Sequence, residues 1–136
     1  MAPAAGGAKG ASARLRVAAV PAAARETRHW AVGFVREHGA RASAARTVEL
    51  LVSEVVTNAV KYGAVADAIA ISLRCADGAV TVRVTDDSTV RPVVRKARPS
   101  DLGGRGMELV ERLAEDWGVD VDARRGKTVW FRVSLR

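Results

Sequence analysis

The sequence has few of the residues on which common catalytic and metal sites depend. Its 136 residues include one cysteine and two histidines, so it offers no cysteine–histidine cluster for zinc and no visible Ser-His-Asp or Cys-His set. Cys75 has no partner for an internal disulfide, which is typical of the reducing cytosol. No apolar run approaches the roughly 18 residues that span a bilayer, and no secretory signal is visible. We therefore expect a cytoplasmic protein without membrane contact.

Aromatic residues are also scarce, at 4% of the chain, so no basic-aromatic platform for single-stranded nucleic acid is evident. The net charge of +7 and the pI near 10.7 are nevertheless typical of a nucleic-acid binder. The charge is uneven, with net values of +6 over residues 1–48, −3 over 49–90 and +4 over 91–136. An Arg-rich solvated surface explains this pattern equally well, and a direct nucleic-acid binder stays the third and least favoured of our hypotheses.

The length allows one domain with one core. Residues 1–13 are low in complexity and indicate a flexible tail, and residues 14–136 form the expected domain. Apolar residues that recur about every 3.6 residues predict helices, and apolar residues at every second position predict strands. The expected strands are Leu15–Val20 and those around Ile69–Leu73, Val80–Val84 and Val129–Leu135; the expected helices are Ala22–Glu37, Ser43–Tyr62 with Ser43 as its cap, and Arg105–Asp116. This predicts an α/β two-layer sandwich, with a mostly antiparallel mixed sheet of about five strands covered on one face by about three helices.

The second expected helix carries a line of polar residues at the border of its apolar stripe. Glu54, Asn58 and Lys61 follow the spacing i, i+4, i+7, which places them on one face. A solvated helix edge would look the same. However, asparagine is a poor helix former, and Asn58 is the only asparagine in the chain. A carboxylate and an amide oxygen in line are suitable ligands for a hard cation such as Mg²⁺.

Two further features are weak taken singly. Glycines at 103, 104 and 106 open the third expected helix, where free N–H groups attract phosphate, although such glycines commonly form only a turn. Asp86 ends the Val80–Val84 strand and could accept a hydrogen bond from a ligand amine, although a strand-end aspartate is more often part of a turn.

The order of these features is more specific than any one of them. Glu54-Val-Val-Thr-Asn58, the strand-end Asp86, Gly104-Arg-Gly106, and Gly126-Lys-Thr128 before a final strand closely resemble the GHKL (histidine kinase/Hsp90-like) ATPase superfamily. Within it, the short single-domain form and the stretch from Ser53 to Gly63 look like the anti-sigma-factor serine kinases of the SpoIIAB/RsbW type. The resemblance covers roughly residues 15–135, and the composition looks actinobacterial.

The resemblance implies a Bergerat fold that holds ATP and Mg²⁺ between the helices and the sheet. The residues matching the family's motifs are Glu54 as the catalytic carboxylate, Asn58 as the Mg²⁺ ligand, Asp86 on the adenine amino group, Gly104, Arg105 and Gly106 at the hinge of the ATP lid, Thr128 in the adenine pocket, and Arg28 in contact with a partner. The implied partners are a sigma factor and an anti-anti-sigma (STAS-domain) protein, whose serine or threonine would be phosphorylated in a partner switch that regulates transcription. Homodimers are also expected, because relatives commonly dimerise.

One departure from the family's pattern keeps an alternative function open. After Asp86 the family usually shows Asp-x-Gly-x-Gly, whereas this chain has Ser88 and Val90 at the glycine positions, which restricts the backbone beside the nucleotide. The alternative is a catalytically weak or inactive module, binding nucleotide or none, that sequesters a sigma factor or another partner. A sensor histidine kinase fragment would need a dimerisation helix pair, for which 136 residues leave no room.

Overall fold

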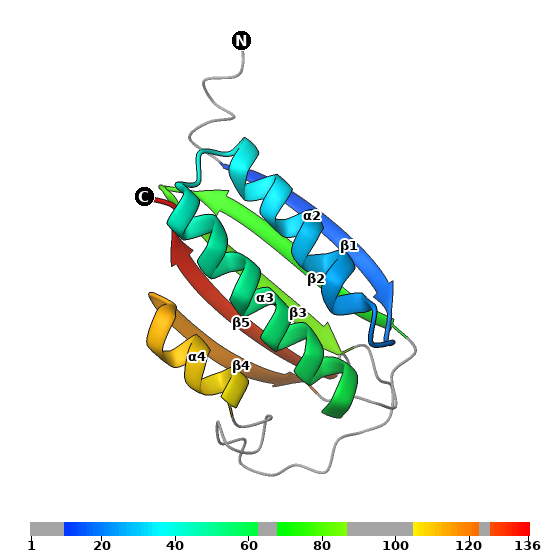
Figure 1. Cartoon of the computed structure of the whole chain (residues 1–136). Helices are drawn as coiled ribbons and strands as arrows, with labels where there is room; N and C mark the ends of the chain where they lie inside the picture. Colours follow the sequence, from blue (N-terminus) through cyan, green and yellow to red (C-terminus); the bar gives the residue numbers. More distant parts are fainter. Residues whose placement is uncertain (1–9, 63–67, 87–104, 123–125) are drawn as a thin grey trace.

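The computed structural model describes residues 10–62, 68–86, 105–122 and 126–136. The elements are, in chain order, β1 (Ala11–Ala18), α2 (Ala23–Glu37), α3 (Ala42–Tyr62), β2 (Ala68–Ala76), β3 (Ala79–Asp86), α4 (Arg105–Leu113), β4 (Asp116–Asp122) and β5 (Gly126–Ser134). They form an α/β sandwich with one five-stranded sheet and three helices (Figure 1). The expected fold class is confirmed.

The strands follow the order β1-β2-β3-β5-β4 across the sheet, and all four pairings are antiparallel. Strands β2 and β3 form a hairpin through Asp77 and Gly78, whose φ angles are 54° and 74°. Positive φ at both central residues is typical of a type I′ turn, which matches the twist of the flanking strands. The Asp77-Gly78 pair therefore forms the turn of this hairpin.

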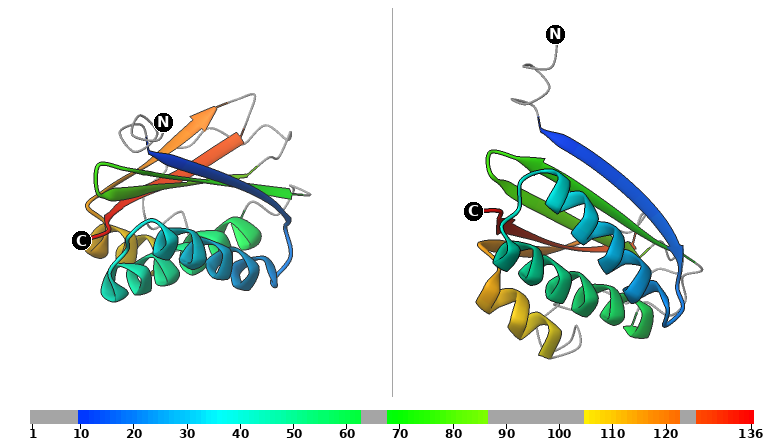
Figure 2. Two further views of the ribbon diagram at one scale, coloured as in Figure 1. Left: turned by 90° about the horizontal axis from the view of Figure 1, so that it is seen from above. Right: turned by 45° about the horizontal axis from the view of Figure 1, so that its top comes forward.

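The three helices lie on the same face of the sheet, as the edge-on view in Figure 2 shows. Helix α3 lies between α2 and α4 and is the helix through which the helical layer meets the centre of the sheet. The core is built from the apolar periods seen in the sequence: Leu51, Val52, Val55 and Val56 of α3, Ala31 and Val35 of α2, Met107 and Val110 of α4, Ile69, Ile71 and Leu73 of β2, Val80, Val82 and Val84 of β3, and Phe131 and Val133 of β5. Burying these side chains is the main stabilisation of the fold.

The opposite face of the sheet is polar. Arg83 of β3 pairs with Asp120 of β4 at 3.2 Å, and Arg132 of β5 pairs with Glu115 at 3.1 Å. All four side chains are about half exposed, so each pair adds little to stability. Gly118 of β4 lies opposite Trp130 of β5, and a Cβ placed there would be 2.6 Å from the indole nitrogen.

Four expectations differ from the structure at the ends of elements. Strand β1 begins at Ala11 and ends at Ala18, so the last three residues of the expected tail pair with β2 and the expected end at Val20 is wrong; residues 1–9 lie outside the described residues. Helix α3 begins at Ala42, so Ser43 lies inside its first turn and is not its cap. Helix α4 ends at Leu113, three residues before the expected Asp116. Asp116 instead begins the edge strand β4, which the sequence did not predict as a separate element.

Candidate functional site

A single polar amide marks the site on helix α3. Asn58 follows Glu54 by one helical turn, and both side chains are half-buried at the border of the apolar stripe, as their spacing predicted. The Nδ2 atom of Asn58 is buried and has no hydrogen-bond partner among the described residues. A buried amide without a partner costs about 1–3 kcal/mol. A bound ligand or a water would satisfy such a group.

Asn58 faces a small cavity between the helices and the sheet. Its walls are Val55, Asn58 and Ala59 of α3, Met107 of α4, Val84 and Asp86 of β3, and Lys127 and Val129 of β5. The cavity encloses about 10 Å³, close to the minimum that a single water requires. Glu54 is not among the described residues that line it. A ligand of larger size therefore needs side chains such as Met107 to move.

The polar wall of the cavity is a pair of opposite charges on neighbouring strands. Asp86 and Lys127 lie directly opposite each other in the β3–β5 ladder. The Asp86 side chain is only 8% exposed, and Lys127 is half-buried. Burial lowers the pKa of the Lys127 ammonium, and the Asp86 carboxylate opposes that shift. The cavity thus offers a hydrogen-bond acceptor and a donor side by side.

Thr128 is not among the described residues that line this cavity, and its expected role in an adenine pocket stays a prediction. Thr128 lies opposite Thr85 in the ladder, and their hydroxyls share a hydrogen bond of 2.8 Å. Side chains alternate between the faces of a strand, so Thr128 points to the face away from the helices while Lys127 and Val129 point inward. The residue of β5 that lies opposite Asp86 is Lys127.

The glycine-rich segment is described in part. Arg105 and Gly106 are the first two residues of α4, as the sequence predicted. Gly104 lies outside the described residues, as do the departures at Ser88 and Val90. The roles expected for these positions stay predictions.

The residues present fit a nucleotide better than a metal held by protein alone. Within the described ranges, no group of three or more His, Cys, Asp or Glu side chains could hold a metal ion. Mg²⁺ commonly takes only one or two protein ligands beside substrate phosphates and water. The amide oxygen of Asn58 would therefore be enough as a protein ligand to a Mg²⁺ ion that the phosphates of a nucleotide also bind. The apolar walls with one buried carboxylate suit a flat aromatic base carrying an amino group.

Comparison with known families agrees with this geometry. The sequence pattern of the histidine kinase-like ATPase domain matches residues 17–133. The chain belongs to this family. As a histidine kinase-like ATPase domain it is expected to bind ATP, and its sandwich of one sheet and three helices is consistent with that fold. A comparison with curated proteins finds no match.

Two further features lie outside the cavity: the hydropathy of the helices and a groove lined by Arg28. No helix in the described part of the chain is long and apolar enough to cross a membrane.

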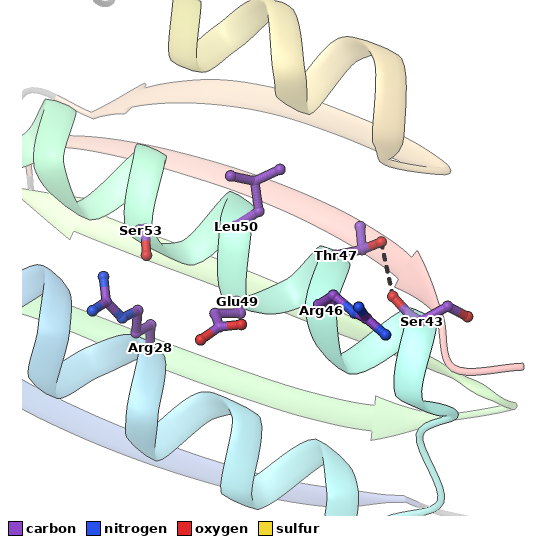
Figure 3. A pocket seen from close by; sticks show the side chains of 7 residues that line it. All are labelled: Arg28, Ser43, Arg46, Thr47, Glu49, Leu50 and Ser53. Atoms are coloured by element: carbon purple, nitrogen blue, oxygen red, sulfur yellow. Dashed lines mark hydrogen bonds between the residues drawn. The ribbon is translucent and has the colours of Figure 1, made fainter.

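Arg28 of α2 lines, together with six residues of α3, an open groove that shares no lining residue with the cavity (Figure 3). The groove encloses about 640 Å³, and its other lining residues are Ser43, Arg46, Thr47, Glu49, Leu50 and Ser53. In Figure 3 the Arg28 side chain extends from α2 toward the side of α3 that carries Glu49 and Ser53.

Sequence reasoning missed two residues of the cavity, Met107 and Lys127. The period-2 pattern of Val129, Phe131 and Val133 extends to Lys127 and predicts that it points inward. That signal was present in the sequence. Met107 carried no such signal, because its place in the wall depends on how α4 packs against α3.

Proposed function

We propose that this ATPase domain is an anti-sigma factor with serine/threonine protein kinase activity. It would bind Mg-ATP and phosphorylate a STAS-domain anti-anti-sigma protein, so that the partners of the sigma factor change. The observation that carries the proposal is the buried, unpartnered amide of Asn58, which faces a cavity whose other wall holds the buried carboxylate of Asp86. These two groups come from different layers of the sandwich, and the nucleotide would join them.

Each polar group has a chemical task in this proposal. The Asp86 carboxylate accepts a hydrogen bond from the exocyclic amino group of the base. The Asn58 amide oxygen holds Mg²⁺, and its Nδ2 donates to a phosphate oxygen. Bound Mg²⁺ supplies neutralisation of the phosphate charge, which is the main requirement of phosphoryl transfer. Glu54 lies one turn before Asn58 and would accept the proton of the attacking hydroxyl, which contributes about 10²–10⁴-fold.

The partner would approach a different surface. Arg28 lines the groove between α2 and α3, beside Arg46 and Glu49. A groove of about 640 Å³ with charged and apolar walls is of the size that accommodates a protruding side chain or short segment of a partner. We assign Arg28 to partner binding on this basis and on the family resemblance. Homodimerisation stays an expectation of the resemblance.

Phosphate transfer from labelled ATP to a purified STAS-domain protein tests the kinase activity. Glu54→Gln removes the carboxylate with little change in shape, so we expect transfer to fall about 10²–10⁴-fold while ATP affinity is kept. Glu37→Gln, at the exposed end of α2, is the matched control and should transfer like the wild type. Transfer that survives Glu54→Gln would remove Glu54 as the base.

The second candidate function is a module that sequesters a sigma factor without catalysis. The small volume of the cavity, about 10 Å³, favours it because the present packing leaves no room for a base. Calorimetry with Mg-ATP separates the two. Nucleotide binding without transfer to any of several STAS-domain partners, or no nucleotide binding together with sigma-factor capture, would favour the sequestering module.

A further inference from the structure

Among the described residues that line the cavity, Lys127 is the one charged residue that the proposed function does not use. It projects from β5 into the space between the layers, on the same face as Val129 and Phe131, which are 8% and 0% exposed. A half-buried ammonium group loses part of its hydration, and burial accordingly lowers the pKa of Lys127. An inward lysine is costly there, and a lysine at this position therefore calls for a specific interaction.

The position of Lys127 relative to Asp86 limits what that interaction can be. The two residues lie directly opposite each other on antiparallel strands, where Cβ atoms are about 4.5–5.5 Å apart. The ammonium is only a donor and the ionised carboxylate is only an acceptor. Together they present a donor and an acceptor on one wall of the cavity, facing Val55 and Met107. The Watson–Crick edge of adenine carries the complementary pair, because the acceptor N1 is adjacent to the amino group at position 6.

We propose that Lys127 reads the base of the bound nucleotide, donating a hydrogen bond from its ammonium to N1 of adenine while Asp86 accepts one from the neighbouring amino group. This inference rests on the proposed nucleotide site. It makes Lys127 a specificity-determining residue, whereas a purely structural role would make it only the counter-charge of Asp86. The two roles differ in one respect: only base reading depends on N1.

An analogue of ATP in which N1 is replaced by a C–H group, 1-deaza-ATP, isolates that atom. Affinities of the full chain for ATP and for 1-deaza-ATP are measured by calorimetry in the presence of Mg²⁺. A hydrogen bond from a charged donor corresponds to about 10- to 100-fold in affinity. We expect the wild type to bind 1-deaza-ATP weaker than ATP by that factor. Lys127→Met keeps the length of the side chain without its charge, and we expect it to bind both nucleotides with equal, reduced affinity.

Arg132→Met is the matched control, because it removes a positive charge from the same strand on the opposite, exposed face. It should discriminate between the two nucleotides like the wild type. If Lys127→Met is too unstable to assay, the wild-type comparison can still overturn the proposal, because base reading by Lys127 requires a loss of affinity when N1 is replaced. Equal wild-type affinity for ATP and 1-deaza-ATP, or a ratio unchanged by Lys127→Met, overturns the role of Lys127 and leaves the nucleotide site intact. Failure of the wild type to bind either nucleotide overturns both.

Discussion

Replacing Asn58 with leucine should make the ligand-free protein more stable. Leucine has the same number of side-chain heavy atoms as asparagine, so the packing beside the cavity changes little. Its side chain carries no donor, and the buried Nδ2, which has no partner among the described residues, is removed together with its desolvation cost. That cost is about 1–3 kcal/mol. Leucine also gains a few tenths of a kcal/mol in helix propensity.

The free energy of unfolding from urea titration measures this gain. We expect Asn58→Leu to raise the free energy of unfolding by about 1–3 kcal/mol. For a domain of this size each kcal/mol raises the Tm by about 3–5 °C. Thr57→Leu is the matched control: Thr57 is the neighbouring half-buried residue of α3, and the substitution changes helix propensity by a similar amount without touching the buried amide. It should add only a few tenths of a kcal/mol.

In the presence of Mg-ATP the wild type should become more stable than Asn58→Leu. A ligand at 1,000 times its Kd stabilises the folded state by about 4.1 kcal/mol, which is more than the gain from Asn58→Leu, and only the protein with Asn58 should receive this. A destabilised Asn58→Leu protein, or one stabilised by Mg-ATP as much as the wild type, would refute the reasoning. In the first case the amide holds the fold together, and in the second it does not touch the ligand.

Three further predictions concern stability. Phe131 is fully buried in β5, so Phe131→Ala should lower the free energy of unfolding by about 3–5 kcal/mol in urea titration. Gly118→Ala should cost about 1–3 kcal/mol in the same assay, because its Cβ meets the Trp130 ring at 2.6 Å; a neutral effect would contradict that contact. Because burial lowers the pKa of Lys127 below its ordinary 10.5, the unfolded chain binds more protons in the window between the two pKa values, and stability should rise with pH there. The buried Cys75 thiol has a raised pKa and makes the free energy of unfolding fall with pH. The difference in unfolding free energy between the wild type and Lys127→Met, measured against pH, therefore isolates the contribution of the lysine. A difference that does not change with pH would contradict the lowered pKa of Lys127.

The sequence predicted those parts of the fold in which one periodicity dominates. The hairpin around Asp77 and Gly78 and the helix containing Asn58 follow from local patterns, and both are present. Strand β4 was missed because three aspartates and Gly118 in seven residues have low strand propensity. Its pairing with β5 at the edge of the sheet provides the stabilisation that its own sequence lacks.

The candidate site divides in the same way. Asn58 was identified because an isolated asparagine inside a helix has a local cost that the sequence displays. Asp86 was identified from its place at a strand end, but its burial depends on β5 and the helical layer. The motif predicted Thr128 for an adenine pocket, and the residue next to it, Lys127, is the one that lines the described cavity. A motif locates a site residue along the chain only to within about one position. On a strand, a shift of one position moves the side chain to the other face of the sheet.

Helix α3 contributes residues to both candidate surfaces. Asn58 lines the cavity with Met107 of α4, while Glu49 and Ser53 line the groove with Arg28 of α2. If a base is admitted by a rotation of α3 as a stiff body, and not only by a movement of side chains such as Met107, the same rotation also reshapes the wall of the groove. Binding at the two surfaces is then thermodynamically linked, and the linkage is reciprocal. A partner that prefers the nucleotide-bound orientation of α3 would tighten nucleotide binding by the same factor by which the nucleotide tightens the binding of that partner, and both surfaces draw on the 21 residues of this one helix.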